Sequence, residues 1–116
     1  MMNIIEFMQK LVEITNDEKI KWDGNSTFLM NGYVIFFKKY HIYLTHDMRN
    51  SKNEYRIKIF NSDDRISVIK KTVPYNENSD LLQVILTLES AIRHKEKEDK
   101  LLKIIMDNIL GEVNDE

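Results

Sequence analysis

The sequence predicts a small α+β fold: an N-terminal helix, an antiparallel meander of four to five strands, and a long C-terminal helix that packs on the sheet and extends beyond it. Three observations predict this fold. Apolar residues recur every three or four positions near both ends, and they alternate with polar residues in residues 28–68. The final apolar run lies too far along its helix to be covered by the rest of the chain. We expect residues 1–116 to form a single domain, with residues 94–116 as a protruding helical interaction segment.

The N-terminal helix is predicted from Asn3, a suitable N-cap, to the turn formers Asn16 and Asp17. Its apolar stripe consists of Ile4, Ile5, Met8, Leu11, Val12 and Thr15, and is widened by Phe7 and Ile14. A short strand is then predicted at residues 20–22 and a turn at residues 23–25. We expect Trp22 to anchor the core.

A hairpin is predicted next, because Asn31-Gly32 separates the apolar runs 27–30 and 33–37 and suits a type I′ turn. The 33–37 strand is apolar on both faces, so we expect it to be central or covered on two sides. Turns at residues 38–40, 47–53 and 61–64 divide the rest of the meander into strands at residues 41–45, 55–60 and 66–69. Pro74 ends the last strand.

The alternation assigns faces to the meander. Ile42 and Leu44 are expected to face the core, and Tyr55, Ile57 and Ile59 alternate with polar residues in the same way. The opposite face, with its rim, is a candidate ligand or nucleic-acid surface made of Lys38, Lys39, His41, Tyr43, Arg56 and Lys58. Aromatic and basic side chains on a sheet can bind nucleic acid, but a protein interface or a solvated face has the same composition.

The C-terminal helix is predicted from Asp80 as N-cap to a stop at Gly111. Its sheet-covering stripe is Leu81, Val84, Ile85, Leu88, Ala91 and Ile92. The polar stretch 93–100 offers ion pairs four residues apart, Lys95 with Asp99 and Glu96 with Lys100.

Length decides the role of the last turns. A helix over residues 80–110 is about 46 Å long, whereas a compact chain of this size is roughly 35 Å across. We expect the end to overhang and to be buried by a partner, most simply a second copy, through Leu101, Leu102, Ile105, Met106 and Ile109. The alternative is a break at residues 94–99 that folds the end back, although that span has no Gly or Pro.

The net charge of −2 is unevenly distributed. Residues 33–71 carry nine basic and four acidic groups, whereas residues 72–116 carry five basic and ten acidic groups. This asymmetry suits a nucleic-acid face, association between oppositely charged parts, or plain solvation.

No motif predicts catalysis, a cofactor or a metal site. The chain has no cysteine and three scattered glycines, so thiol chemistry and glycine-rich phosphate loops are excluded. His41 and His46 are expected on opposite faces of one strand, and Asp63-Asp64 is a typical turn. No apolar stretch approaches the roughly 20 residues of a membrane span, and we expect a cytoplasmic protein.

These observations favour a non-enzymatic protein-binding module, a small homodimeric inhibitor or adaptor of another protein. Size and acidity match phage anti-defence and immunity proteins, by analogy of composition only, and the wealth of Ile, Lys and Asn suits a phage or low-GC bacterium. The alternative is a nucleic-acid-associated accessory protein that uses the basic sheet face.

Overall fold

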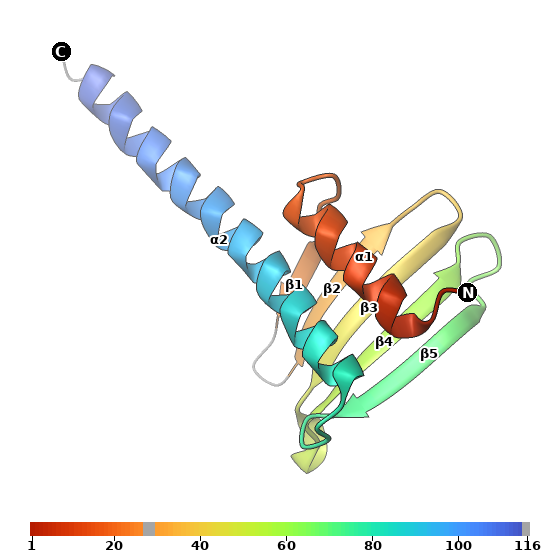
Figure 1. The fold of residues 1–116 in the computed structure, drawn as a ribbon. Coiled ribbons are helices and arrows are strands. Elements are labelled where there is room, and N and C mark those ends of the chain that lie inside the picture. The colour runs from red at the N-terminus through yellow and green to blue at the C-terminus, as the bar shows by residue number, and fades with distance from the viewer. Residues whose placement is uncertain (27–29, 115–116) are drawn as a thin grey trace.

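The computed structural model describes residues 1–26 and 30–114 and has the predicted α+β fold, with both helices on one face of a five-stranded sheet (Figure 1). The elements in order are α1 (Ile4–Asn16), β1 (Asp23–Ser26), β2 (Met30–Phe36), β3 (Tyr40–Asp47), a 3₁₀ turn (Arg49–Ser51), β4 (Glu54–Asn61), β5 (Ser67–Pro74) and α2 (Asp80–Asn114).

The sheet is an antiparallel meander in the order β1-β2-β3-β4-β5. Ile42 of β3 lies opposite Ile35 of β2 and Ile59 of β4, so these side chains project from one face. That face carries α1 and α2, and the core lies between them and the sheet. The predicted assignment of Ile42 and Leu44 to the core is confirmed.

The hairpin predicted at Asn31-Gly32 is wrong, because both residues lie inside β2 and pair with β1. No glycine in the described chain has the positive φ that a type I′ turn requires. Residues 27–29, which the sequence assigns to a strand, lie outside the described residues. Strand pairing overrides the turn signal here, since residues 31 and 32 pair with β1 on one side and with β3 on the other.

The strand predicted at residues 20–22 is also wrong, because the segment predicted to turn, 23–25, lies within β1. Trp22 is 5% exposed and anchors the core as expected. The 33–37 run is central in the sense that β2 lies between β1 and β3, but it is not covered on two sides. Phe36 alternates with buried Tyr33 and Ile35, so it lies on the face that lacks helices, and it is 57% exposed.

Both helix starts are capped by side chains. Asn3 Oδ1 accepts a 2.8 Å hydrogen bond from the Glu6 amide, which confirms the predicted N-cap. In α2 the cap is Ser79, whose hydroxyl accepts from the Leu82 amide, so the prediction of Asp80 is off by one residue. The predicted stop at Gly111 is wrong, because α2 continues to Asn114 and Gly111 lacks the left-handed conformation of a helix terminator.

The length of α2 sets the shape of the molecule. Its 35 residues span about 52 Å, and the chain measures 59 × 35 × 26 Å. The radius of gyration is 17.2 Å, against about 13 Å for a compact chain of this size. α2 is unbroken at residues 94–99, and its C-terminal part extends beyond the sheet (Figure 1).

Candidate functional site

The C-terminal half of α2 is the most exposed apolar part of the described chain. Every residue from 97 to 114, a segment we call the overhang, is exposed. The overhang carries eight large apolar side chains that are 45% to 62% exposed: Leu101, Leu102, Ile104, Ile105, Met106, Ile109, Leu110 and Val113. The five residues predicted to contact a partner are among them. Ile104 and Leu110 lie in the same predicted apolar run but were not among those five contact residues, and Val113 of the same surface was missed.

The apolar side of the overhang continues the buried side of α2. Positions eighteen residues apart are about five full helical turns apart and point the same way. Buried Val84, Leu88 and Ile92 are therefore followed, on the same side, by exposed Leu102, Met106 and Leu110. The helix thus repeats a core-facing stripe beyond the end of the core.

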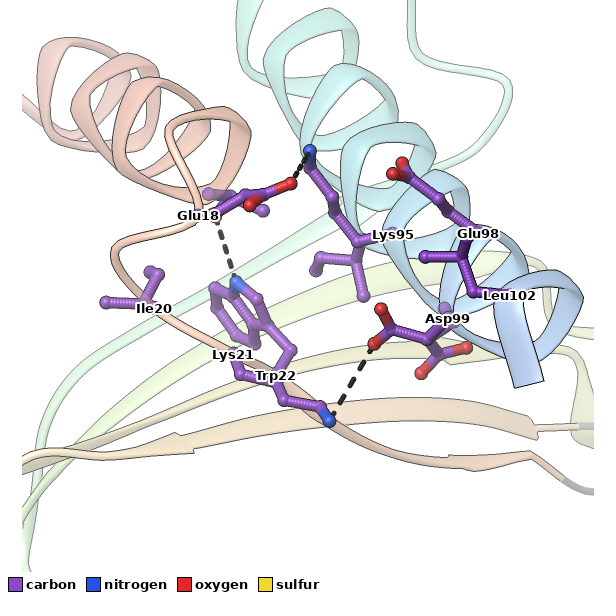
Figure 2. A pocket seen from close by; sticks show the side chains of 11 residues that line it. Glu18, Ile20, Lys21, Trp22, Lys95, Glu98, Asp99 and Leu102 are labelled. Atoms are coloured by element: carbon purple, nitrogen blue, oxygen red, sulfur yellow. Dashed lines mark hydrogen bonds and ion pairs between the residues drawn. The ribbon is translucent and has the colours of Figure 1, made fainter. Parts of the chain in front are cut away.

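Two ion pairs hold the point at which α2 leaves the sheet (Figure 2). Lys95 Nζ lies 2.9 Å from Glu18 Oε1, and Lys21 Nζ lies 3.7 Å from Asp99 Oδ2. These pairs join α2 to the segment between α1 and β1, whereas the sequence predicted pairs within the helix. The hydrogen bond to Lys95 lowers the pKa of Glu18 and raises that of Lys95. All four side chains are partly or largely exposed, so the pairs orient the helix more than they stabilise it.

Beneath these pairs lies a cavity of about 290 Å³ whose apolar wall includes Trp22, Ile92 and Leu102. The Trp22 indole N–H donates a 3.0 Å hydrogen bond to the buried Thr15 hydroxyl. Leu102 is thus the last overhang residue that reaches the rest of the molecule. From residue 103 to residue 114 the side chains make no hydrogen bond or ion pair with any described part of the chain.

An apolar groove of about 620 Å³ lies on the helix-bearing face, and we call it the α1 groove. Phe7, Leu11 and Ile14 of α1 form one wall. The floor and opposite wall are Phe37, Tyr40, Ile42, Ile59, Val68 and Ile69. The opposite side of α1, with Ile5 and Val12, faces α2. α1 therefore packs against α2 on one side and leaves the groove open on the other.

The face of the sheet without helices carries an aromatic cluster. Phe36 packs edge-on against His41 and Tyr43, with ring centroids 4.7 and 6.5 Å apart, and Tyr43 packs edge-on against Phe60 at 5.3 Å. These four rings line a shallow hollow of about 460 Å³ together with Thr45, Lys58 and Arg65. Of the predicted surface, the structure brings His41, Tyr43 and Lys58 together in this hollow.

The other predicted members lie outside the hollow. Arg56 shares the face but pairs with Glu54 at 2.7 Å, and Lys38 and Lys39 lie in the turn between β2 and β3. Phe36, Phe60 and Arg65 were missed. Strict alternation in β2 and β4 places Phe36 and Phe60 on this face, but Arg65 enters from a turn whose path the sequence does not reveal.

Charges are segregated along this open face. At one end Asp47 binds Arg49, and the hydrogen bonds from the Arg49 side chain and backbone lower the pKa of Asp47 to about 2. At the aromatic end, Lys58 and Arg65 have no ion-pair partner within the described chain, although Asp63 and Asp64 lie in the same turn as Arg65. A ligand at the aromatic end would meet free cations.

The two strand histidines lie on opposite faces, as predicted. His41 belongs to the aromatic cluster, whereas His46 stacks on Tyr55 at 4.1 Å and lies 2.6 Å from Asn53 Oδ1. In residues 1–26 and 30–114 no three acidic or histidine side chains are arranged to hold a metal ion.

None of the helices in the described chain is long and apolar enough to cross a membrane. Comparison of the chain with protein-family models, curated proteins and solved structures finds no match.

Proposed function

We propose that the protein is a non-enzymatic protein-binding module that self-associates through the overhang and, as a homodimer, acts as an inhibitor or adaptor of another protein. The observation that carries the proposal is the row of eight half-exposed apolar side chains on a helix that has left its own core. A dimer would present two copies of the open sheet face, which suits a protein that bridges or blocks a partner.

The size of the unburied surface supports association. Fully burying a Leu or Ile side chain contributes about 1.5–3 kcal/mol, so eight half-exposed side chains leave roughly 6–12 kcal/mol unrealised. A two-fold dimer buries two overhangs, which offsets an association cost of about 4–15 kcal/mol.

Helix stability points the same way. An isolated helix of fewer than about 15 residues is marginal in water, and most helices in proteins depend on packing of an apolar face. The part of α2 beyond Leu102 packs against nothing in the described chain and also contains Gly111, a poor helix former. A partner supplies the missing packing.

A membrane surface is a poorer occupant than a protein. Helices that lie on membranes carry several basic residues on the polar face, whereas residues 101–116 carry four acidic groups and one basic group, Lys103. Anionic lipid would repel this segment.

The test replaces Leu102, Ile105 and Ile109 together by Ser and measures molar mass by size-exclusion chromatography with light scattering. A matched control replaces Lys100, Lys103 and Asp107, on the polar side of the same turns, by Ser. We expect a dimer for the parent and for the control. For the apolar triple variant we expect a monomer whose core is still folded, as judged by circular dichroism. A parent chain that is monomeric throughout the micromolar range contradicts the proposal.

A second function, binding of single-stranded nucleic acid, is favoured by the hollow on the open face. Four aromatic rings and two unpaired cations surround it, and base stacking on aromatic rings combined with phosphate neutralisation is how sequence-tolerant binding proteins work. The net acidity of the chain opposes this function but does not act locally, because the acidic groups are concentrated in residues 72–116.

Fluorescence anisotropy with a labelled oligothymidylate tests this second function. Lys58→Glu with Arg65→Glu should abolish binding, whereas Lys103→Glu on the overhang should not. Binding should also weaken as salt rises. If the parent does not bind, or if binding is indifferent to salt and to the double variant, this function is rejected.

A further inference from the structure

The α1 groove has the apolar lining of a helix-binding site. Its walls are apolar side chains from α1, from the turn before β3 and from β3, β4 and β5, and several of them are substantially exposed: Phe37 37%, Tyr40 46%, Val68 51% and Ile69 40%. α2 already packs against one side of α1, and the groove on the other side is the place where a further helix would complete the layer (Figure 1).

The chain itself carries an unpartnered helix with a matching surface. Leu102, Met106, Ile109 and Val113 recur at intervals of four, three and four residues, the spacing by which an amphipathic helix fills a groove. We propose that the α1 groove of each protomer receives the overhang of a second copy, so that two overhangs are exchanged across a two-fold axis. This proposal rests on the self-association proposed above and specifies its binding mode.

Charge complementarity supports this occupant. Residues 102–116 of the incoming chain carry four acidic groups and one basic group, Lys103. Lys38 and Lys39 lie in the turn beside Phe37 and Tyr40, and Lys71 shares the groove-bearing face because it lies opposite buried Ile57. None of these lysines has an ion-pair partner in the described chain. Asp63 and Asp64, in the turn before β5, are the acidic groups that come just before the groove residues Val68 and Ile69 in the sequence.

Pairing of overhang with overhang is the competing arrangement. It covers the apolar stripe of α2 but leaves Val68, Ile69 and the rest of the groove in water. Exchange of overhangs covers both apolar surfaces through one kind of contact, and in a two-fold dimer the same contact is made twice.

The absence of cysteine from the chain permits a direct cross-linking test. One protein carries Val68→Cys at the groove, and separate proteins carry a single cysteine at position 105, 109 or 113 of the overhang. Each overhang variant is mixed with the groove variant and treated with a short bismaleimide. Lys58→Cys, on the other face of the sheet, replaces the groove variant as the matched control.

Exchange predicts a cross-link between the groove cysteine and at least one overhang cysteine, at a yield several-fold above that of the Lys58→Cys control. Cross-linking only between two overhang cysteines, or a groove yield no higher than the control, overturns the assignment of the groove. Val68 is half exposed, so its replacement should leave the fold intact, and the circular dichroism spectrum checks this.

A second variant separates failure of the groove from failure of self-association. Val68→Asp places a carboxylate among apolar walls and should weaken the dimer at least tenfold. A dimer that survives Val68→Asp but is lost in the Leu102, Ile105 and Ile109 triple variant overturns the groove and keeps the proposed function. A parent chain that is monomeric overturns both.

Discussion

The Tyr55 hydroxyl donates a 2.9 Å hydrogen bond to Glu89 Oε1, and this bond ties β4 to α2 inside the core. Glu89 is 7% exposed, and its second oxygen has no hydrogen bond within the described chain but lies 3.9 Å from Arg93 Nη2. Burial, followed by the hydrogen bond to Glu89, raises the pKa of Tyr55, so the phenol remains a neutral donor. Arg93 in turn donates to the Tyr33 hydroxyl at 3.2 Å.

Tyr55→Phe removes the only hydrogen bond that the buried Glu89 carboxylate receives in the described chain. We expect it to lower the free energy of unfolding by about 1–3 kcal/mol, because a buried charged acceptor is left without its donor. Urea unfolding measures the change. Tyr43→Phe is the matched control, since the Tyr43 hydroxyl makes no hydrogen bond within the described chain, and it should change stability by less than about 0.5 kcal/mol. Equal effects of the two variants would contradict a stabilising role for the hydrogen bond between Tyr55 and Glu89.

Thr15→Val removes the acceptor of the Trp22 indole N–H, and both groups are buried. We expect a loss of about 1–3 kcal/mol, because the donor stays buried without a partner. The control is Thr87→Val, which removes a comparable hydroxyl bond to the preceding helical turn at an exposed site. Emission from Trp22, the single tryptophan, reports unfolding directly. A Thr15 variant no less stable than the Thr87 variant would show that the bond is unimportant.

Gly111→Ala distinguishes the helix stop predicted from the sequence from the continuous helix of the structure. No atom lies within 4 Å of the added methyl group, and φ of Gly111 is not positive. Alanine in a helix interior is favoured over glycine by about 0.5–1 kcal/mol, so helical circular dichroism should rise or hold at higher temperature. A fall in helicity would mean that Gly111 adopts a left-handed conformation. Gly24→Ala should instead lower stability, because its methyl group would lie 2.5 Å from Glu96 Oε1 and 3.1 Å from the Tyr33 ring.

The Asp47 carboxylate makes stability depend on pH in the acid range. Hydrogen bonds from Arg49 lower its pKa from 3.8 to about 2, so its contribution is present above the unfolded value and is lost as the pH falls from 3.8 towards 2. The difference in urea midpoint between the parent and Asp47→Asn should therefore be largest above pH 4 and shrink towards pH 2. A difference that is constant over this interval would contradict the coupling.

Much of the fold could be predicted from the sequence, because the spacing of the apolar residues agrees with the residues that the structure buries. The alternation in β3 and β4 assigned Ile42, Leu44 and Tyr55 correctly, and the spacing in α1 identified its cap at Asn3. The length argument correctly predicted that α2 extends beyond the sheet. The first two predictions depend on local sequence patterns, and the third depends on comparing the length of the helix with the size of a compact chain.

The errors arose where a local signal competed with packing. Asn31-Gly32 is a strong turn signal, but pairing with both β1 and β3 keeps it inside β2. Lys95 and Asp99 suit an ion pair within the helix. In the fold, however, Lys95 pairs with Glu18 and Asp99 pairs with Lys21. The α1 groove could not be predicted for a similar reason, because its walls come from α1, from the turn before β3 and from three strands. No sequence window contains them.

Amide hydrogen exchange of residues 104–110 tests most directly whether a second copy covers the end of α2. We predict slow exchange at high protein concentration, faster exchange on dilution, and fast exchange at every concentration in the Leu102, Ile105 and Ile109 triple variant. Fast exchange of these amides in the parent chain, unchanged between dilute and concentrated samples, would show that the apolar end of the helix stands in water without a partner.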